Sequence, residues 1–259
     1  MGANLTVRNV NIGGGRPKVC VPLVGRTDEN VISEADRIRS ALSLGSGIDI
    51  VELRIDYYEA VNDADSIKKL LEKVRHVLPD EVLLLYTLRS EREGGEQLPE
   101  GADYITAVEA GLESGIPDII DVELDAPGRP ELVEAIRSKG KKIILSKHFF
   151  DSTPEDELML GLITDMEAAG ADIAKLAVMP KDKQDVIRLM SVTEQLTRDV
   201  LKIPLITMSM GRLGAVSRAC GGLFGSAATF GSLFEASAPG QIPVVELNKI
   251  IELLDANCG

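Results

Sequence analysis

Short apolar segments alternate along the chain with longer segments of helical periodicity. Eight segments read as strands buried on both faces. Seven are short apolar runs rich in Val, Ile or Leu, at residues 18–24, 48–55, 82–89, 119–124, 142–148, 172–178 and 203–209, and the eighth, 225–231, consists mostly of small residues. Apolar positions three or four residues apart predict helices between them, over residues 28–44, 64–78, 102–114, 130–139, 153–170, 183–201, 213–220 and 243–256. We expect Thr153 to cap the fifth of these helices, with Pro154 at its first position.

This alternation predicts an α/β fold with a parallel sheet, because strand–helix–strand units form right-handed crossovers. Eight such units in 259 residues favour closure into a (β/α)8 TIM barrel, which usually has about 250 residues. An open doubly wound sheet is the less favoured alternative, since the sequence has no glycine fingerprint after the first strand. We therefore expect a single domain over residues 1–259, with an N-terminal β-hairpin in residues 1–17 that closes the bottom of the barrel.

Composition narrows the possible partners. A net charge of −13 disfavours nucleic acid and anionic membranes as partners, and an anionic ligand would need a locally basic pocket. The three cysteines, Cys20, Cys220 and Cys258, are far apart and form no CxxC pair, so neither a zinc site nor a disulfide framework is indicated. Reduced thiols and an N-terminus without signal-peptide character favour a cytoplasmic protein.

Charged residues gather at the ends of the predicted strands, where a barrel carries its chemistry. The set is Glu52, Arg54, Asp56, Arg89, Asp121, Glu123, His148, Lys175 and, after the seventh strand, Arg218. One such residue would be unremarkable, but packing alone does not account for so many on one face of the barrel. The sequence therefore predicts a polar site at the C-terminal ends of the strands.

Lys175 lies within the apolar strand 173–178, where a buried cation is costly unless it is paired or neutral. One interpretation is a structural ion pair with Glu52 or Glu123, or a side chain that reaches solvent at the strand end. The other is a nucleophile, because burial lowers the pKa of an amine. A neutral amine attacks a ketone to give an imine, and the protonated imine withdraws electrons from the neighbouring C–H bond.

His148 ends the strand that precedes the Lys175 strand, so the two side chains could share one substrate. Imidazole titrates near neutral pH and suits general acid/base catalysis. A histidine that only satisfies local hydrogen bonds at a strand end is the alternative.

Arg218 precedes a long stretch of small residues, 221–241. The guanidinium could bind a carboxylate with two hydrogen bonds, or form only a surface salt bridge. The small-residue stretch could be a mobile cover from which Ser237 and Gln241 reach inward, or a plain surface loop.

Ten short motifs, taken in order, resemble those of type I 3-dehydroquinate dehydratases over nearly the whole chain. They occupy residues 51–54 with Asp56, 87–90, 93–95, 121–124, 146–148 with 153–154, 175–180, 208–211, 217–218, 224–230 and 236–241. The resemblance implies a cytoplasmic, homodimeric hydro-lyase of the shikimate pathway, which serves aromatic amino acid biosynthesis. Such an enzyme converts 3-dehydroquinate to 3-dehydroshikimate without a metal or organic cofactor.

The resemblance also implies a role for each site residue. Lys175 would form the Schiff base, His148 would take the C2 proton and help water to leave, Glu93 would support His148, and Arg218 would hold the substrate carboxylate. Glu52, Arg54 and Arg89 would contact ring hydroxyls or order the pocket, and Ser237 and Gln241 would close over the substrate.

The sequence departs from the family pattern at one position, and two alternative functions remain possible. Phe149 stands where the family pattern has Asn or Asp, which puts a local hydrogen bond beside His148 in doubt. A class I Schiff-base aldolase or transaldolase barrel would also use an imine-forming lysine, although the sequence has no clear phosphate-binding glycine loop after strands seven and eight. An inactive homologue that senses the same metabolite would need neither Lys175 nor His148.

Overall fold

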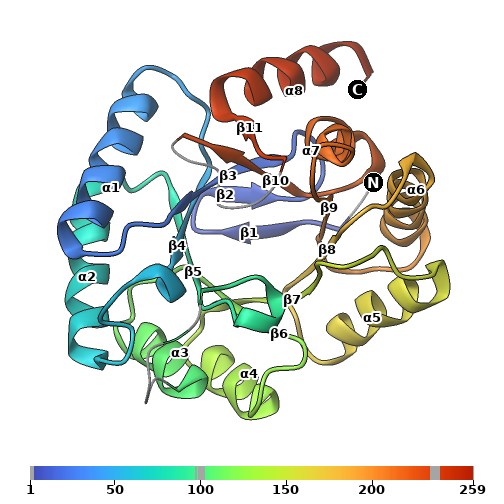
Figure 1. The fold of residues 1–259 in the computed structure, drawn as a ribbon. Helices are drawn as coiled ribbons and strands as arrows, with labels where there is room; N and C mark the ends of the chain where they lie inside the picture. Colours follow the sequence, from blue (N-terminus) through green and yellow to red (C-terminus); the bar gives the residue numbers. More distant parts are fainter. Residues whose placement is uncertain (1–2, 97, 99–102, 234–239, 259) are drawn as a thin grey trace.

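The structure is a computed structural model that describes residues 3–96, 98, 103–233 and 240–258. Parallel strands form a central ring, and the helices surround it (Figure 1). The ring strands are β3 (Lys18–Leu23), β4 (Ile50–Arg54), β5 (Leu83–Thr87), β6 (Ile119–Glu123), β7 (Lys142–Phe149), β8 (Ile173–Val178), β9 (Leu205–Ser209) and β10 (Ala228–Ser232). The helices are α1 (Asp28–Ser43), α2 (Ala64–Val77), α3 (Tyr104–Glu113), α4 (Arg129–Ser138), α5 (Asp156–Ala168), α6 (Lys183–Asp199), α7 (Ala215–Cys220) and α8 (Val244–Cys258).

The two ends of the sheet meet, as a closed barrel requires. Pairing runs in the order β10, β3, β4 and onward to β9, with the two-residue strand β11 (Ile242–Pro243) beside β10. A parallel bridge joins Leu205 at the start of β9 to Ser226 just before β10, and the backbone N–H of Ala227 donates to Leu205 O at 2.7 Å. The α/β barrel expected from the alternation of apolar segments is therefore confirmed.

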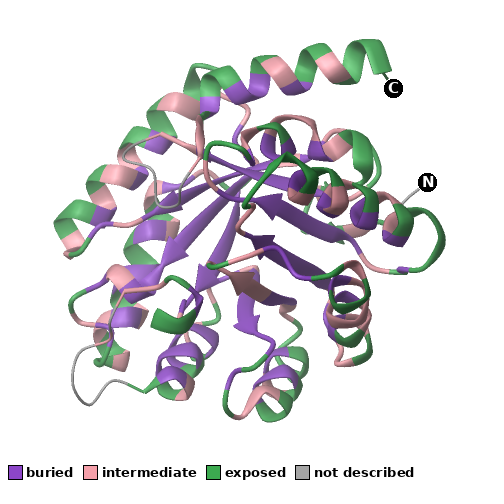
Figure 2. Cartoon of the chain, turned by 45° about the vertical axis from the view of Figure 1, so that its right-hand side comes forward, coloured by how far each residue is buried: buried purple, intermediate pink, exposed green. Residues whose placement is uncertain are grey.

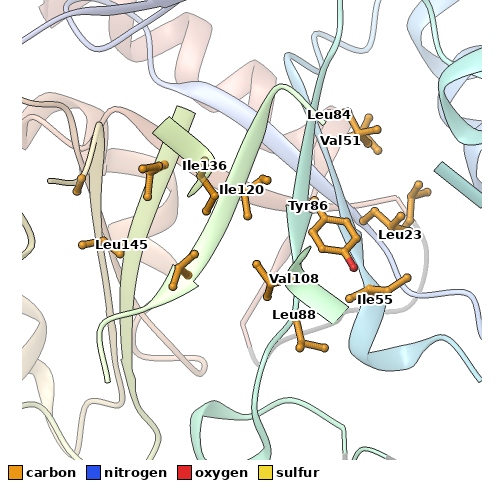
Figure 3. Packing of buried hydrophobic residues seen from close by; sticks show 14 of the residues in the cluster. Leu23, Val51, Ile55, Leu84, Tyr86, Leu88, Val108, Ile120, Ile136 and Leu145 are labelled. Atoms are coloured by element: carbon orange, nitrogen blue, oxygen red, sulfur yellow. The ribbon is translucent and has the colours of Figure 1, made fainter. Parts of the chain in front are cut away.

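Two apolar clusters fill the two sides of the sheet. The larger lies between the strands and the helices, where Leu84 and Tyr86 of β5 meet side chains such as Val108 of α3 (Figure 3). The smaller lies inside the ring and includes Ile50 and Ile173. Figure 2 shows the result, with strands buried along their length and helices exposed on their outer sides. Strands buried on both faces explain why the sequence shows apolar runs instead of period-two alternation.

An antiparallel hairpin of β1 (Leu5–Val7) and β2 (Val10–Ile12) precedes the barrel, as expected. Its residues Val7 and Ile12 belong to the apolar cluster inside the ring. At its turn Arg8 forms ion pairs with Asp80 and Asp118, at 3.5 and 3.7 Å, and these two aspartates precede β5 and β6. The hairpin thus packs at the N-terminal ends of the strands and leaves the opposite ends open.

Two local predictions differ from the structure. Thr153 does not cap the fifth helix: its hydroxyl donates to Met179 O at 3.1 Å, and α5 begins two residues later with Glu155 at the N-cap position. The last barrel strand begins at Ala228 and not at Gly225, because Gly225 ends the 3-10 helix η3 (Gly221–Phe224) in a left-handed conformation with φ +101°. Among the described residues, no helix combines the length and apolarity needed to cross a membrane.

Candidate active site

A cavity with an empty volume of about 500 Å³ opens at the C-terminal ends of the strands. Eight of the nine residues to which the family resemblance gives a role line it: Glu52, Arg54, Arg89, Glu93, His148, Lys175, Arg218 and Gln241. The remaining residue, Ser237, lies outside the described residues. The charges predicted from strand ends therefore meet in one place.

Strand geometry explains this convergence. Successive side chains alternate between the two faces of a strand, so Ile50, Glu52 and Arg54 of β4 all point into the ring. On β8, Ile173 and Lys175 share the inner face in the same way. Each strand thus supplies an apolar residue near its start and a charged residue one or two pleats further on.

Lys175 is only 3% exposed and is held by carboxylates. Its Nζ donates to Asp121 Oδ2 at 3.1 Å and lies 3.7 Å from Glu52 Oε1. The ion pair considered from the sequence therefore exists for Glu52, but the nearer partner is Asp121 and not Glu123. Burial alone would raise the pKa of Asp121, but Arg89 and Lys175 outweigh it and lower the pKa to about 2. Asp121 is therefore ionised beside the amine at neutral pH.

Arg89 joins the carboxylates beneath the cavity into one network. Its Nη2 donates to Asp121 Oδ1 at 2.8 Å, and its Nη1 donates to Ser146 Oγ at 2.8 Å. The same nitrogen lies 3.4 Å from Glu123 Oε1, and Glu123 also accepts hydrogen bonds from Ser90. Ser90 donates to both oxygens of Glu123, whereas Arg89 and Ser146 donate to Oδ1 of Asp121 and Oδ2 accepts from Lys175, which accounts for the choice of partner.

His148 lies on the same inner face as Lys175. β7 pairs with β8 so that Ser146 is opposite Lys175, which places His148 one pleat further toward the strand ends. Its Nδ1 is 3.0 Å from Glu93 Oε2, and its backbone N–H donates to the same oxygen at 3.1 Å. An ionised Glu93 fixes the proton on Nδ1 and leaves Nε2 as a proton acceptor. Burial, reinforced by Arg89 and Lys175, lowers the pKa of His148 well below its usual value, so the imidazole is a neutral base.

Glu93 belongs to the 3-10 helix η2 (Glu91–Glu93) in the loop after β5. It is 3% exposed. Burial, and then Glu123, raise its pKa to about 7, against the opposing effects of Arg89 and Lys147. The periodicity of the sequence did not point to this residue, because it follows no strand directly. Only the family resemblance placed it in the site.

The two remaining arginines differ in their surroundings. Arg54 binds Asp56 with two hydrogen bonds of 2.8 and 2.7 Å and lies over the ring of Tyr57. Arg218 is 1% exposed, so the surface salt bridge considered from the sequence is wrong. Its Nη1 lies 3.6 Å from Met208 Sδ, and burial lowers its pKa to about 10. Arg218 therefore remains a cation at neutral pH, and its burial would strengthen its attraction for an anion in the cavity.

The cavity wall is basic although the chain is acidic. Four of its side chains are Lys or Arg and two are Glu, and one of these two, Glu93, has its pKa raised to about 7. The lining therefore presents more cations than carboxylates to a ligand, while Asp56 and Asp121 behind it pair with Arg54, Arg89 and Lys175.

Phe149 does not enter the cavity. It alternates with His148 along β7, so its ring points outward and packs against the larger apolar cluster. The hydrogen bond that was in doubt beside His148 is supplied by Glu93 instead.

Sequence reasoning missed the apolar part of the wall. Phe150, Met208, Met210 and Phe230 line the cavity, and the ring of Phe230 lies 4.8 Å from Lys175 Nζ. Met and Phe at these positions look like ordinary core residues in the sequence. The contacts of Lys147 were missed for a related reason, since alternation along the strand predicts that its side chain points away from the site.

Comparisons with known proteins find similar chains over nearly the whole sequence. A family model described as type I 3-dehydroquinase matches residues 19–258. A 3-dehydroquinate dehydratase from Clostridioides difficile is 39% identical over 256 residues, 98% of each chain, and one from Bacillus subtilis is 38% identical over the same length and coverage. The crystal structure of a type I 3-dehydroquinate dehydratase from Clostridium difficile with covalently modified comenic acid has a TM-score of 0.92 at 38% identity, with 100% of both chains covered. That of a 3-dehydroquinate dehydratase from Geobacillus kaustophilus has a TM-score of 0.92 at 36% identity, also with 100% of both chains covered.

Proposed function

The chain belongs to the type I 3-dehydroquinase family, and on that premise we propose that Lys175 forms a Schiff base with the ketone of 3-dehydroquinate. The family membership identifies the reaction as the dehydration of 3-dehydroquinate, a hydro-lyase step of the shikimate pathway. The residues that carry out this step are assigned below from their positions in the cavity.

Imine formation begins when the deprotonated amine of Lys175 attacks the C3 carbonyl carbon of the substrate. The carbinolamine then loses its oxygen as water and leaves a protonated imine. Asp121 and Glu52 lie 3.1 and 3.7 Å from Nζ, so two carboxylates stand beside the nitrogen and would stabilise the positive charge of the iminium.

Elimination then proceeds through His148. Nε2 takes a proton from C2, and the electrons of that C–H bond flow toward the iminium carbon. The C1 hydroxyl leaves as water when the imidazolium returns the proton to it. Hydrolysis of the conjugated imine releases 3-dehydroshikimate and restores the free amine, so the overall balance is the loss of one water.

Substrate binding uses the basic side chains of the wall. We assign the substrate carboxylate to Arg218, whose burial favours a paired anion. Glu52, Arg54 and Arg89 would contact ring hydroxyls or order the pocket, and Gln241 would close over the substrate together with Ser237.

The family comparison favours the dehydratase over an aldolase, a transaldolase or a metabolite sensor. We further propose a single-domain, cytoplasmic homodimer that needs no metal or organic cofactor, since the imine itself serves as the electron sink. Retention of full activity after treatment with a chelator would support the last point, and loss of activity that a metal restores would contradict it.

The observation that carries this assignment is a buried lysine on β8 that shares one cavity with a histidine on β7. The test is Lys175→Ala, assayed by the absorbance of the conjugated product. We expect turnover to be abolished while circular dichroism shows the native fold. Substantial turnover by the folded variant would overturn the Schiff-base assignment.

A further inference from the structure

We propose that Lys147 is a positioning residue for His148: it holds one oxygen of Glu93 so that the other oxygen orients the imidazole. The proposal rests on the role of His148 as general acid/base given above. Lys147 falls within the motif at residues 146–148, but no role was assigned to it, and the alternation of β7 does not point to it because it lies between two inward-facing residues, Ser146 and His148.

Lys147 and His148 bind different oxygens of the Glu93 carboxylate. Lys147 Nζ donates to Oε1 at 2.9 Å, while His148 donates to Oε2 from its backbone N–H at 3.1 Å and lies within 3.0 Å of it through Nδ1. Consecutive residues of one strand therefore bind both oxygens of one carboxylate. A carboxylate held at both oxygens cannot rotate freely, so the direction of its hydrogen bond to the imidazole is fixed.

Lys147 is itself anchored from the solvent side. Its Nζ also donates to Asp125 Oδ2 at 2.8 Å, and it lies 5.6 Å from the centre of the Phe149 ring. The Lys147 side chain is 18% exposed, that of Asp125 is 64% exposed and that of Glu93 is 3% exposed. The ammonium thus bridges a solvated carboxylate and a buried one, which distinguishes it from a surface ion pair of little energetic value.

The charge of Glu93 depends on few neighbours. Glu123 of β6 opposes its ionisation, as does burial, whereas Lys147 of β7 and Arg89 at the end of β5 favour it. Arg89 Nη1 is 3.7 Å from Oε2 and is committed to Asp121 and Ser146 at 2.8 Å. His148 is the remaining titratable contact, and its neutral form adds no charge. Lys147 is therefore the cation in direct hydrogen-bond contact with Glu93, whose pKa is about 7.

Loss of the ammonium changes the tautomer of His148. Without Lys147, Glu93 takes up a proton at a higher pH than in the wild type. A protonated Glu93 donates to Nδ1, which then must be the unprotonated nitrogen, and the proton of the imidazole moves to Nε2. Nε2 then has no lone pair with which to accept the C2 proton, so catalysis fails at a pH where the fold is intact.

The experiment is the pH profile of kcat for Lys147→Met and Lys147→Arg beside the wild type. We expect the acidic limb of Lys147→Met to move upward by about one pH unit, which is about a tenfold loss of kcat on that limb, with recovery toward the wild-type value at high pH and little change in KM. Lys147→Arg restores a cation and should return the limb to its wild-type position. A uniform loss of kcat at every pH, or no loss, would overturn the proposal.

Lys142→Met is the matched control, because Lys142 lies on the same strand and forms its own ion pair with Asp172 at 3.1 Å, away from the cavity. Its profile should match the wild type, and a shift equal to that of Lys147→Met would also overturn the proposal. The Schiff-base mechanism is tested separately by Lys175→Ala. If that mechanism is wrong, Lys175→Ala will turn over substrate at the wild-type rate. If Lys175→Ala is inactive and the limb of Lys147→Met does not move, only the positioning role fails.

Discussion

Asp121 Oδ2 lies 3.1 Å from Lys175 Nζ, and both side chains are buried, Lys175 in the lining of the cavity and Asp121 behind it. This pair links stability to chemistry, because the carboxylate that holds the ammonium in the folded protein also lies beside the nitrogen that would carry the iminium charge. Arg89 binds the other oxygen of Asp121 at 2.8 Å. Asp121 is therefore the nearest carboxylate to two buried cations at once, and its loss would leave both with less compensating charge.

Asp121→Asn should lower the free energy of unfolding by about 3 kcal/mol at pH 7, because it leaves Arg89 and Lys175 short of a negative charge. The pKa of Asp121 is about 2 in the folded protein, below its ordinary value of 3.8. Its contribution to stability is thus fully present above pH 3.8 and is lost as the pH falls toward 2. Urea unfolding of both proteins at pH 6 and pH 3 measures this. A wild-type advantage that does not shrink at pH 3 would contradict the pairing.

His148→Ala should separate the two halves of the reaction. The variant retains Lys175 and the carboxylates beside it, so the imine should still form. Elimination should slow by about 10²- to 10⁴-fold, the usual contribution of a general acid/base. Single-turnover mass spectrometry would detect the accumulated imine after reduction. Normal turnover by the variant would show that another group takes the C2 proton.

Arg218→Lys should raise KM far more than it lowers kcat. A lysine keeps the charge but loses the planar pair of donors that binds a carboxylate through two hydrogen bonds. The expected loss in kcat/KM is about 10- to 100-fold, or roughly 1.5 to 3 kcal/mol. Arg198→Lys serves as the control, because that side chain is 60% exposed and pairs with Glu194 on the surface of α6. Equal effects of the two substitutions would remove Arg218 from the binding site.

Gly94→Ala should disturb the site through Phe150. Gly94 has φ +80°, and a Cβ added there would lie 2.0 Å from Cζ of the Phe150 ring, next to Glu93 in the chain. The substitution must displace either the ring or η2, so we expect a loss of activity of tenfold or more together with lower thermal stability. Gly140→Ala is the control: it has a similar φ of +70° with nothing within 4 Å of its Cβ. It should cost only the backbone strain of about 1 kcal/mol and leave kcat unchanged.

The fold can be predicted from the sequence because strands buried on both faces appear as short runs of apolar residues. Continuous apolar runs such as 173–178, separated by helical segments, are enough to predict a parallel barrel, and the barrel itself dictates that Glu52, His148 and Lys175 face the same end. The residues at which helices and strands begin and end are harder to predict from the sequence. Thr153 looked like a helix cap but bonds Met179 across the fold, a long-range contact that local sequence cannot reveal.

The site was predictable only where charge interrupts an apolar pattern. Lys175 and Arg218 are conspicuous for this reason, whereas Phe230 and Met208 line the same cavity yet resemble core residues. Glu93 needed the family resemblance, since its contact with His148 joins a 3-10 turn to a strand 55 residues away. The pairing of Lys175 with Asp121 depends on which carboxylate Arg89 and Ser90 already occupy, and only coordinates reveal that competition.

The measurement that tests the central claim most directly is borohydride reduction during turnover of 3-dehydroquinate, followed by peptide mass spectrometry. The account predicts one covalent adduct on the peptide that contains Lys175, with none on Lys147, whose amine bonds Glu93 beside the site. Turnover that continues without any trapped adduct, or an adduct on a different lysine, would contradict it.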